Sequence, residues 1–311
     1  MKNKKILCVT GVLAVFIAGV LMGYFGTQTT NLLARNKHPL LASRVQGNNP
    51  NEVRVGFSPL RSKLIDYVNS YQDPSIFSVY FEYLPTGTSV TINPEQEAIA
   101  ASLIKVPLAM NIFKLIEQGK IDIDATVTLK PEFLDSEYGE LYKKGAGYEL
   151  TIQEAIRYNL SESDNTAMLA LWDVYEDAVI AYDDDVFNYL DVDFDLVEDE
   201  RVLIGPKSYS SILKCLYFAC YNSKNHSQEI LTYLTESSFN DRLTRYLPDK
   251  KKVAHKIGTF SDRFQSDCGI IYATNNNYVL CVMVEGNDPE ASKAIADISR
   301  IVHIHVNDYI E

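Results

Sequence analysis

Residues 100–116 read AASLIKVPLAMNIFKLI, and this stretch determines how the rest of the chain is arranged. Almost every position after Ser102 is apolar, which is typical of a helix surrounded by protein on all sides. Ser102 stands at the start of this predicted helix and Lys105 follows three residues later, so both side chains share one face. A hydroxyl beside a buried amine is a candidate activated nucleophile, because burial disfavours the ammonium form. The alternative is a helix-capping serine followed by a lysine that reaches solvent.

The composition narrows the class of protein. The chain has 311 residues, of which 46% are hydrophobic, and this is enough for a substantial core. Its net charge is −12 and it has no basic stripe, which argues against a nucleic-acid partner. Cysteines stand at positions 8, 215, 220, 268 and 281. The spacing of Cys215 and Cys220 on a helix suits no disulfide, and a tight hairpin turn would place Cys281 opposite Ile270. We therefore expect the cysteines to be small core residues.

The first 59 residues differ in character from the rest. Three lysines precede an uncharged segment, residues 6–25, whose 20 residues match the length that spans a bilayer. The lysines predict an N-terminus inside the cell and a catalytic domain outside it, so we expect a single-pass protein of the cell membrane. A cleaved signal peptide, and hence secretion, is the alternative. The sequence predicts an anchor over 1–26, a flexible spacer over 27–59 and a catalytic domain over 60–311.

The order of predicted elements in the domain indicates an α+β fold. A helix and two strands come first, a block of helices follows, and three strands and a final helix end the chain. This order predicts one antiparallel sheet built from N- and C-terminal strands, flanked by a helical block. The predicted elements include helices at 60–71, 206–221, 228–237, 241–246 and 291–309, and strands at 77–83, 89–92, 253–260, 268–273 and 278–285.

Three short motifs stand in a fixed order along the domain. They are Ser102-x-x-Lys105 at a helix start, Ser163-Asp164-Asn165 between two helices, and Lys256-Ile257-Gly258-Thr259 on a strand. Each motif alone has an ordinary structural explanation, such as a capping loop or an exposed strand lysine. Together, each in its expected structural context, they are much more specific.

The three motifs resemble those of the penicillin-recognising serine hydrolases, and in particular of the class A β-lactamases. The resemblance covers about residues 60–310. It implies that Ser102 is the nucleophile, that Lys105 accepts its proton, and that Ser163 and Lys256 assist proton transfer to the leaving group. It also implies that Asn165, Gly258 and Thr259 bind substrate, and that the backbone N–H groups of Ser102 and Thr259 form the oxyanion hole.

Two departures from the family pattern concern substrate binding and turnover. Position 257 is isoleucine, where the family usually has a threonine or serine that holds the substrate carboxylate, so Thr259 or Arg263 would have to compensate. The family's deacylating loop reads Glu-x-x-Leu-Asn, and here Glu200-x-x-Leu203 keeps only part of it. Glu200 is therefore a weak candidate for the base that activates water. We expect His255 to be a packed strand residue rather than a catalyst.

The sequence thus predicts a serine hydrolase that opens β-lactam amides through a Ser102 acyl-enzyme. One alternative is a D-Ala-D-Ala carboxypeptidase or another peptidoglycan-directed hydrolase. Another is a penicillin-binding sensor that is acylated and does not turn over. No metal or organic cofactor is implied, and we expect a monomer.

Overall fold

The structure is a computed structural model that describes residues 19, 56–178, 185–197, 201–248, 252–261, 263–273 and 276–308. Only Gly19 of the predicted membrane segment belongs to them, so that prediction lies outside the described residues. Within the described ranges, no helix combines the length and the apolar character needed to cross a bilayer. Contacts divide the chain between Arg54 and Val55, and the following description concerns the part from Val55 onward.

An antiparallel sheet of five strands, in the order β2-β1-β10-β9-β8, forms the centre of the described domain. Strand β1 from the N-terminal part pairs with β10 from the C-terminal part, which confirms the predicted sheet. All residues of β1 and most of β8 to β10 are buried, because helices cover both faces of the sheet. The strands are β1 (Phe77–Tyr83), β2 (Thr88–Ile92), β8 (Lys252–Phe260), β9 (Phe264–Tyr272) and β10 (Tyr278–Glu285).

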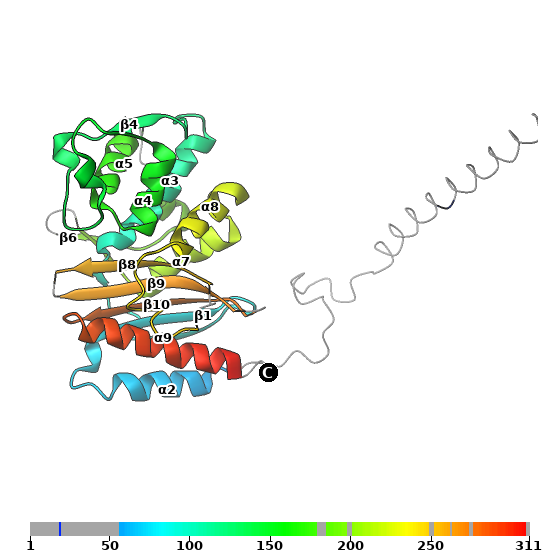
Figure 1. Cartoon of the computed structure of the whole chain (residues 1–311). Coiled ribbons are helices and arrows are strands. Elements are labelled where there is room, and N and C mark those ends of the chain that lie inside the picture. Colours follow the sequence, from blue (N-terminus) through cyan, green and yellow to red (C-terminus); the bar gives the residue numbers. More distant parts are fainter. Residues whose placement is uncertain are drawn as a thin grey trace, which may run out of the picture. The chain divides into compact units, whose positions relative to one another are not determined.

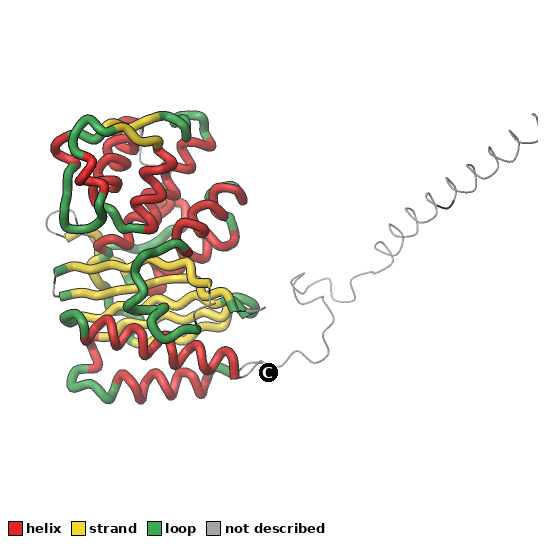
Figure 2. The backbone as a smooth tube through the Cα atoms, viewed as in Figure 1, coloured by secondary structure: helices red, strands yellow, loops and turns green. Residues whose placement is uncertain are grey.

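Helices lie on both faces of this sheet (Figure 1). The helices α2 (Ser58–Val68) and α9 (Glu290–Asp308) cover one face, where Leu60, Leu64, Ile295 and Ile298 are fully buried. A helical block lies on the other side, and Figure 2 shows it as the part of the domain richest in helix. Its helices are α3 (Lys105–Glu117), α4 (Ile152–Ser161), α5 (Asn165–Ala178), α6 (Val186–Leu190), α7 (Pro206–Phe218) and α8 (Lys224–Thr235).

The central helix α3 is buried, as its composition predicts. Ten of its 13 residues are buried, including Lys105 and Asn111. A 3₁₀ turn, η3 (Ala101–Ile104), precedes it and carries Ser102. Helix α4 begins at the predicted capping box, in which Thr151 and Glu154 exchange hydrogen bonds with each other's backbone N–H.

Short strands and 3₁₀ turns complete the described structure. Strands β3 (Ala98–Ile99), β7 (Arg201–Ile204) and β6 (Asp195–Val197) form one small sheet, and β4 (Thr126–Thr128) pairs with β5 (Glu149–Thr151). The 3₁₀ turns are η2 (Pro74–Ile76), η4 (Pro131–Phe133) and η5 (Leu141–Lys144).

The predicted helix over 241–246 is wrong, because this segment forms isolated turns. Arg245 N–H donates to Arg242 O at 3.1 Å, and Leu247 N–H donates to Thr244 O at 3.0 Å. The Arg242 side chain instead runs into the sheet, where it is 5% exposed. Both backbone bonds span three residues, which is the pattern of turns and not the four-residue pattern of an α-helix.

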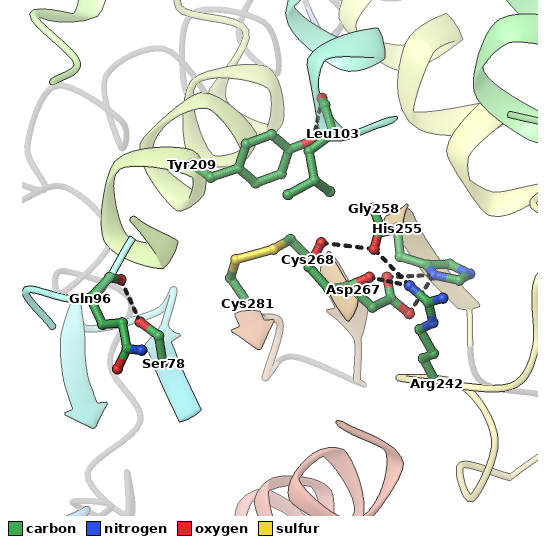
Figure 3. The surroundings of a disulfide bond; sticks show 11 residues. Ser78, Gln96, Leu103, Tyr209, Arg242, His255, Gly258, Asp267, Cys268 and Cys281 are labelled. Atoms are coloured by element: carbon green, nitrogen blue, oxygen red, sulfur yellow. Dashed lines mark hydrogen bonds and ion pairs between the residues drawn. A yellow bond between two sulfur atoms is a disulfide. The ribbon is translucent and has the colours of Figure 1, made fainter. Parts of the chain in front are cut away.

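The prediction that Cys268 and Cys281 are unpaired is also wrong, because they form a disulfide. Tyr278 pairs with Ile271, so the register of β9 differs by two residues from the tight turn that the sequence predicted. This shift places Cys281 opposite Cys268. Figure 3 shows the bond below the Tyr209 ring.

Cys215 and Cys220 form a second disulfide. The prediction that their spacing on a helix suits no disulfide is therefore also wrong. Helix α7 ends at Phe218, and Ala219 adopts a left-handed conformation with φ 50°. The chain therefore turns back, Cys220 N–H donates to Cys215 O at 3.0 Å, and the two Cα atoms lie 5.0 Å apart. The spacing rule fails because the helix ends between the two cysteines.

Candidate active site

Ser102 lies in the 3₁₀ turn η3, next to a strained backbone position. Ala101 has φ 45°, in the left-handed region that L-residues seldom adopt. The Leu103 carbonyl accepts a hydrogen bond from Tyr209 Oη at 3.1 Å, and Tyr209 is 1% exposed (Figure 3). Strain of this kind collects at functional sites, where surrounding contacts hold it in place. The turn therefore holds Ser102, which is half-buried, in a fixed position.

Lys105 follows one turn later and is fully buried. Its Nζ donates to the Ser163 carbonyl, to Asn165 Oδ1 at 2.7 Å and to Ser163 Oγ at 3.3 Å. Burial lowers the pKa of Lys105 to about 8, and the charges of Asp164, Asp135 and Glu137 oppose this shift. A lysine with this pKa can act as a base near neutral pH.

Ser163 is the point where the second motif meets the other two. It has φ 53°, and its hydroxyl lies 2.8 Å from Lys256 Nζ as well as 3.3 Å from Lys105 Nζ. Burial lowers the pKa of Lys256 well below its ordinary value, and the nearby Lys105 charge lowers it further. The Ser163 hydroxyl thus connects Lys105 of the first motif with Lys256 of the third, and Ser163 is fully buried.

Asp164 and Asn165 hold the loop between α4 and α5. The Asp164 carboxylate accepts from the N–H groups of Leu141 and Ala167, both at 2.8 Å. Asn165 Nδ2 donates to Asp135 Oδ1 at 3.1 Å while its Oδ1 accepts from Lys105, so both ends of this amide are oriented. Asp135 is a positioning residue that the motif search missed, since it stands outside all three motifs.

Strand β8 brings the third motif against the Ser102 turn. A Cβ added at Gly258 would lie 2.8 Å from the Ala100 carbonyl oxygen and 3.1 Å from Leu103 Cγ. Only glycine therefore allows the Ala100 backbone and the Leu103 side chain to approach the strand so closely. Since β8 is an edge strand, one side of its backbone is not paired within the sheet.

Arg242, and not Arg263, is the cation beside Thr259. Its guanidinium donates to Thr259 Oγ1 at 2.7 Å, to the Gly258 carbonyl at 2.9 Å and to Gln265 Oε1 at 2.7 Å. Arg263 has a side chain that is 68% exposed, and it lies 3.5 Å from the Glu285 carboxylate. The sequence favoured Arg263 because it is nearer in the chain, whereas the turns over 241–248 bring Arg242 to β8.

His255 is packed in the sheet, as the sequence predicted. It is 2% exposed, and Nδ1 lies 2.9 Å from the Asp267 carboxylate (Figure 3). Two aromatic rings that no motif contained, Tyr138 and Phe239, lie 6.4 Å apart between centroids. Lys256 Nζ lies 6.0 Å from the centre of the Phe239 ring, so this pair forms a wall near the site.

Glu200 lies outside the described residues. The described residues on either side of it pair as antiparallel strands β6 and β7, with Val197 opposite Arg201. Strand β7 also touches the Ser102 segment, because Ala100 N–H donates to Val202 O at 2.8 Å. In the described part of the chain, no group of three or more His, Cys, Asp or Glu side chains is arranged to hold a metal ion.

This fold and these joined motifs define a serine hydrolase of the β-lactamase type, and the chain belongs to the beta-lactamase enzyme family, whose model matches residues 59–306. Its relatives include the extended-spectrum beta-lactamase PER-1 of Pseudomonas aeruginosa, which is 24% identical over 65% of this chain and 72% of that protein. A beta-lactamase of Bacteroides uniformis is 25% identical over 65% of this chain and 77% of its own length.

Solved structures share the fold at low identity. PBP-A superposes with a TM-score of 0.71 and 21% identity, over 81% of this chain and 97% of PBP-A. A class A beta-lactamase from Bacteroides cellulosilyticus gives a TM-score of 0.72 and 19% identity, over 82% and 99% of the two chains.

Proposed function

We propose that this protein reacts with β-lactam amides through an acyl-enzyme on Ser102. The observation that carries this proposal is the convergence of two buried lysines, Lys105 and Lys256, on the Ser163 hydroxyl. Two buried ammonium groups at one hydroxyl repel each other, so this arrangement favours a neutral lysine that can accept a proton. A purely structural core does not require such a pair.

The proposed reaction is a balanced acyl transfer. Ser102 Oγ attacks the lactam carbonyl carbon while Lys105 takes the hydroxyl proton. The C–N bond of the lactam breaks, and Ser163 passes its proton to the leaving nitrogen. Lys105 Nζ, 3.3 Å from Ser163 Oγ, then gives the proton from Ser102 to Ser163 and is neutral again, while Lys256 Nζ lies beside the same hydroxyl. The product is an ester between Ser102 and the opened ring. The backbone N–H groups of Ser102 and Thr259 would stabilise the oxyanion between attack and collapse.

Substrate binding is assigned to Asn165 and to the end of β8. Asn165 can pair with a substrate amide, because its carboxamide both donates and accepts. Gly258 leaves room at the strand edge. In place of the residue that the family uses at position 257, Thr259 Oγ1 is assigned to the substrate carboxylate. The buried Arg242 guanidinium holds this hydroxyl in position by a hydrogen bond at 2.7 Å.

The relatives support this substrate class. PER-1 is named an extended-spectrum beta-lactamase, and a single-residue mutant of PBP-A is described as an acyl-enzyme complex with penicillin G. The structure of that mutant superposes on this chain with a TM-score of 0.71 at 20% identity.

A sensor that is acylated without turnover is the second candidate, and one observation favours it. Two of the described carboxylates near Lys105 already accept hydrogen bonds from other groups of the protein. Asp164 accepts from two backbone N–H groups, and Asp135 accepts from Asn165 and from the Glu137 N–H. These two carboxylates are therefore not free to activate water for deacylation. A peptidoglycan-directed hydrolase that cleaves D-Ala-D-Ala is the third candidate.

One experiment separates these functions. The full chain is incubated with a chromogenic cephalosporin, with labelled penicillin and with a D-Ala-D-Ala peptide, and adducts are mapped by mass spectrometry. Steady turnover of the cephalosporin that Ser102→Ala abolishes supports a β-lactamase. A stoichiometric burst with a stable adduct on Ser102 supports the sensor, and cleavage of the peptide alone supports the third candidate. An unmodified Ser102 with every probe would overturn the proposal.

We also propose that the catalytic domain lies outside the cytoplasm, anchored by residues 6–25. The apolar segment and the preceding lysines support this placement. The two disulfides support it too, since such bonds persist in oxidising compartments. Protease added to intact cells should degrade the domain, and protection of the domain would contradict the placement.

A further inference from the structure

A cavity lies at the beginning of β8, separated from Lys256 by the loop 237–240. Its volume is about 550 Å³, within the usual range of small-molecule sites. Ser237 and Asn240 line it, whereas Phe239 between them lies beside Lys256 and Tyr138. The loop therefore has one side chain at the candidate active site and two at this cavity.

The cavity is cationic in a chain whose net charge is −12. Arg245 and Lys252 line it, and no carboxylate belongs to its described lining. Among the residues that the structure describes, neither cation has an ion-pair partner. Arg245 instead lies over the Tyr246 ring, 5.3 Å from its centre. Two unpaired cations facing one cavity indicate an anionic ligand.

His255 adds a third group, and it is the one that selects among anions. The ring lines the cavity, and its side chain is 3% exposed. Nδ1 faces the Asp267 carboxylate, which can only accept, so Nδ1 carries a proton. Nε2 points away from Asp267 and has no hydrogen bond within the described part of the chain (Figure 3). Hydrogen phosphate matches Nε2 in either protonation state, because it has both an O–H donor and acceptor oxygens.

The rest of the lining fits an organic phosphate. Ser237, Asn240 and Thr244 offer polar hydrogen-bonding groups, while Leu247, Pro248 and Val253 provide an apolar wall. Inorganic phosphate would leave much of a 550 Å³ cavity unfilled. We propose that this cavity binds a phosphomonoester, with the phosphate at Arg245, Lys252 and His255 and the organic group against the apolar wall.

The test is calorimetric titration of the full chain at constant ionic strength with phenyl phosphate, inorganic phosphate and sulfate. The titrations are made at about pH 5.5, below the second pKa of a phosphomonoester (about 6), so that phenyl phosphate keeps one O–H. We expect saturable binding in the order phenyl phosphate, phosphate, sulfate, because sulfate has no O–H and inorganic phosphate has no apolar group. Absence of saturable phenyl phosphate binding up to about 10 mM would overturn the proposal. Equal affinity for phosphate and sulfate would overturn the selection by His255.

Two sets of variants locate the ligand. Arg245→Gln combined with Lys252→Gln should raise the Kd for phenyl phosphate about tenfold or more, since both exposed cations are lost. Arg300→Gln is the matched control, because Arg300 lies over the same Tyr246 ring, 5.7 Å from its centre, but does not line the cavity. Ser102→Ala should leave binding unchanged. An unaffected double variant, or lost binding in Ser102→Ala, would contradict the assigned position.

Discussion

The Nζ atoms of Lys105 and Lys256 flank the same hydroxyl, that of Ser163, at 3.3 and 2.8 Å. The two lysines are 151 positions apart in the sequence, one on the central helix and one on the edge strand. Because burial disfavours charge on both lysines, burying the pair lowers the free energy of unfolding. This cost is typical of a site that prepares a base in advance.

Acylation of Ser102 should depend on pH through Lys105. The pKa of this lysine is lowered to about 8 by burial, and its neutral form is the one that accepts a proton. The rate constant for acylation should therefore rise about tenfold per pH unit below that value and level off above it. Stopped-flow measurement with a chromogenic cephalosporin checks the profile, and a rate that falls as pH rises towards 8 would contradict the role of Lys105.

Arg242→Lys should weaken both folding and carboxylate binding. The lysine cannot reproduce the bonds to Gly258 O, Thr259 Oγ1 and Gln265 Oε1, so buried acceptors lose their partners. We expect a loss of about 2–4 kcal/mol in the free energy of unfolding and a higher KM for substrates with a carboxylate. Urea unfolding and steady-state or burst kinetics measure the two effects.

The control for this variant is Arg263→Lys, because the Arg263 side chain is 68% exposed. Its free energy of unfolding should change by less than about 0.5 kcal/mol, with unchanged kinetics. If the two variants behaved alike, Arg242 would have no special part in the site.

Gly258→Ala should impair acylation while the fold persists. The new Cβ would meet the Ala100 carbonyl at 2.8 Å and displace the turn that carries Ser102. A displacement of about 1 Å at the nucleophile costs on the order of 100-fold in rate. Adduct formation with penicillin, followed by mass spectrometry, gives the rate, and circular dichroism confirms the fold. Normal acylation would show that the turn tolerates the added methyl group.

The two disulfides should differ in their contribution to stability. Replacing Cys268 and Cys281 by alanine opens a loop with a sequence separation of 13, which corresponds to about 3 kcal/mol by chain entropy. The Cys215 and Cys220 pair closes a separation of only five, which corresponds to about 2 kcal/mol. Chemical unfolding of the two double variants tests the order, and a reversed order would contradict the entropic explanation.

Sequence patterns predicted the sheet and the meeting of the motifs, because both depend on strong local signals. The apolar stretch after Ser102 predicted a buried helix, and Thr151 with Glu154 marked the start of the next one. The strands of both ends were recognisable by their β-branched and aromatic residues, and they pair as expected. The Lys105, Ser163 and Lys256 contacts follow from these elements once they are packed.

What the sequence did not predict depends on turns and on long side chains. The left-handed Ala219 brings Cys220 back to Cys215, and a shift of two residues in β9 brings Cys268 opposite Cys281. Arg242 reaches Thr259 from a segment that resembled a helix. Neither kind of feature has a periodic signature, because a turn is decided by a few dihedral angles and a long side chain by the space around it.

Strand β8 carries His255 and Lys256 as neighbours, and neighbouring strand residues face opposite sides. A slip of this strand by one position would put either Ala254 and His255 or Lys256 and Ile257 in these two places, so both sites would change at once. Inserting or deleting a single residue at the start of β8 would therefore disable the nucleophile's surroundings and the phosphate cavity together. Substitutions elsewhere can change the lining of one site alone, but both sites depend on the register of this one strand.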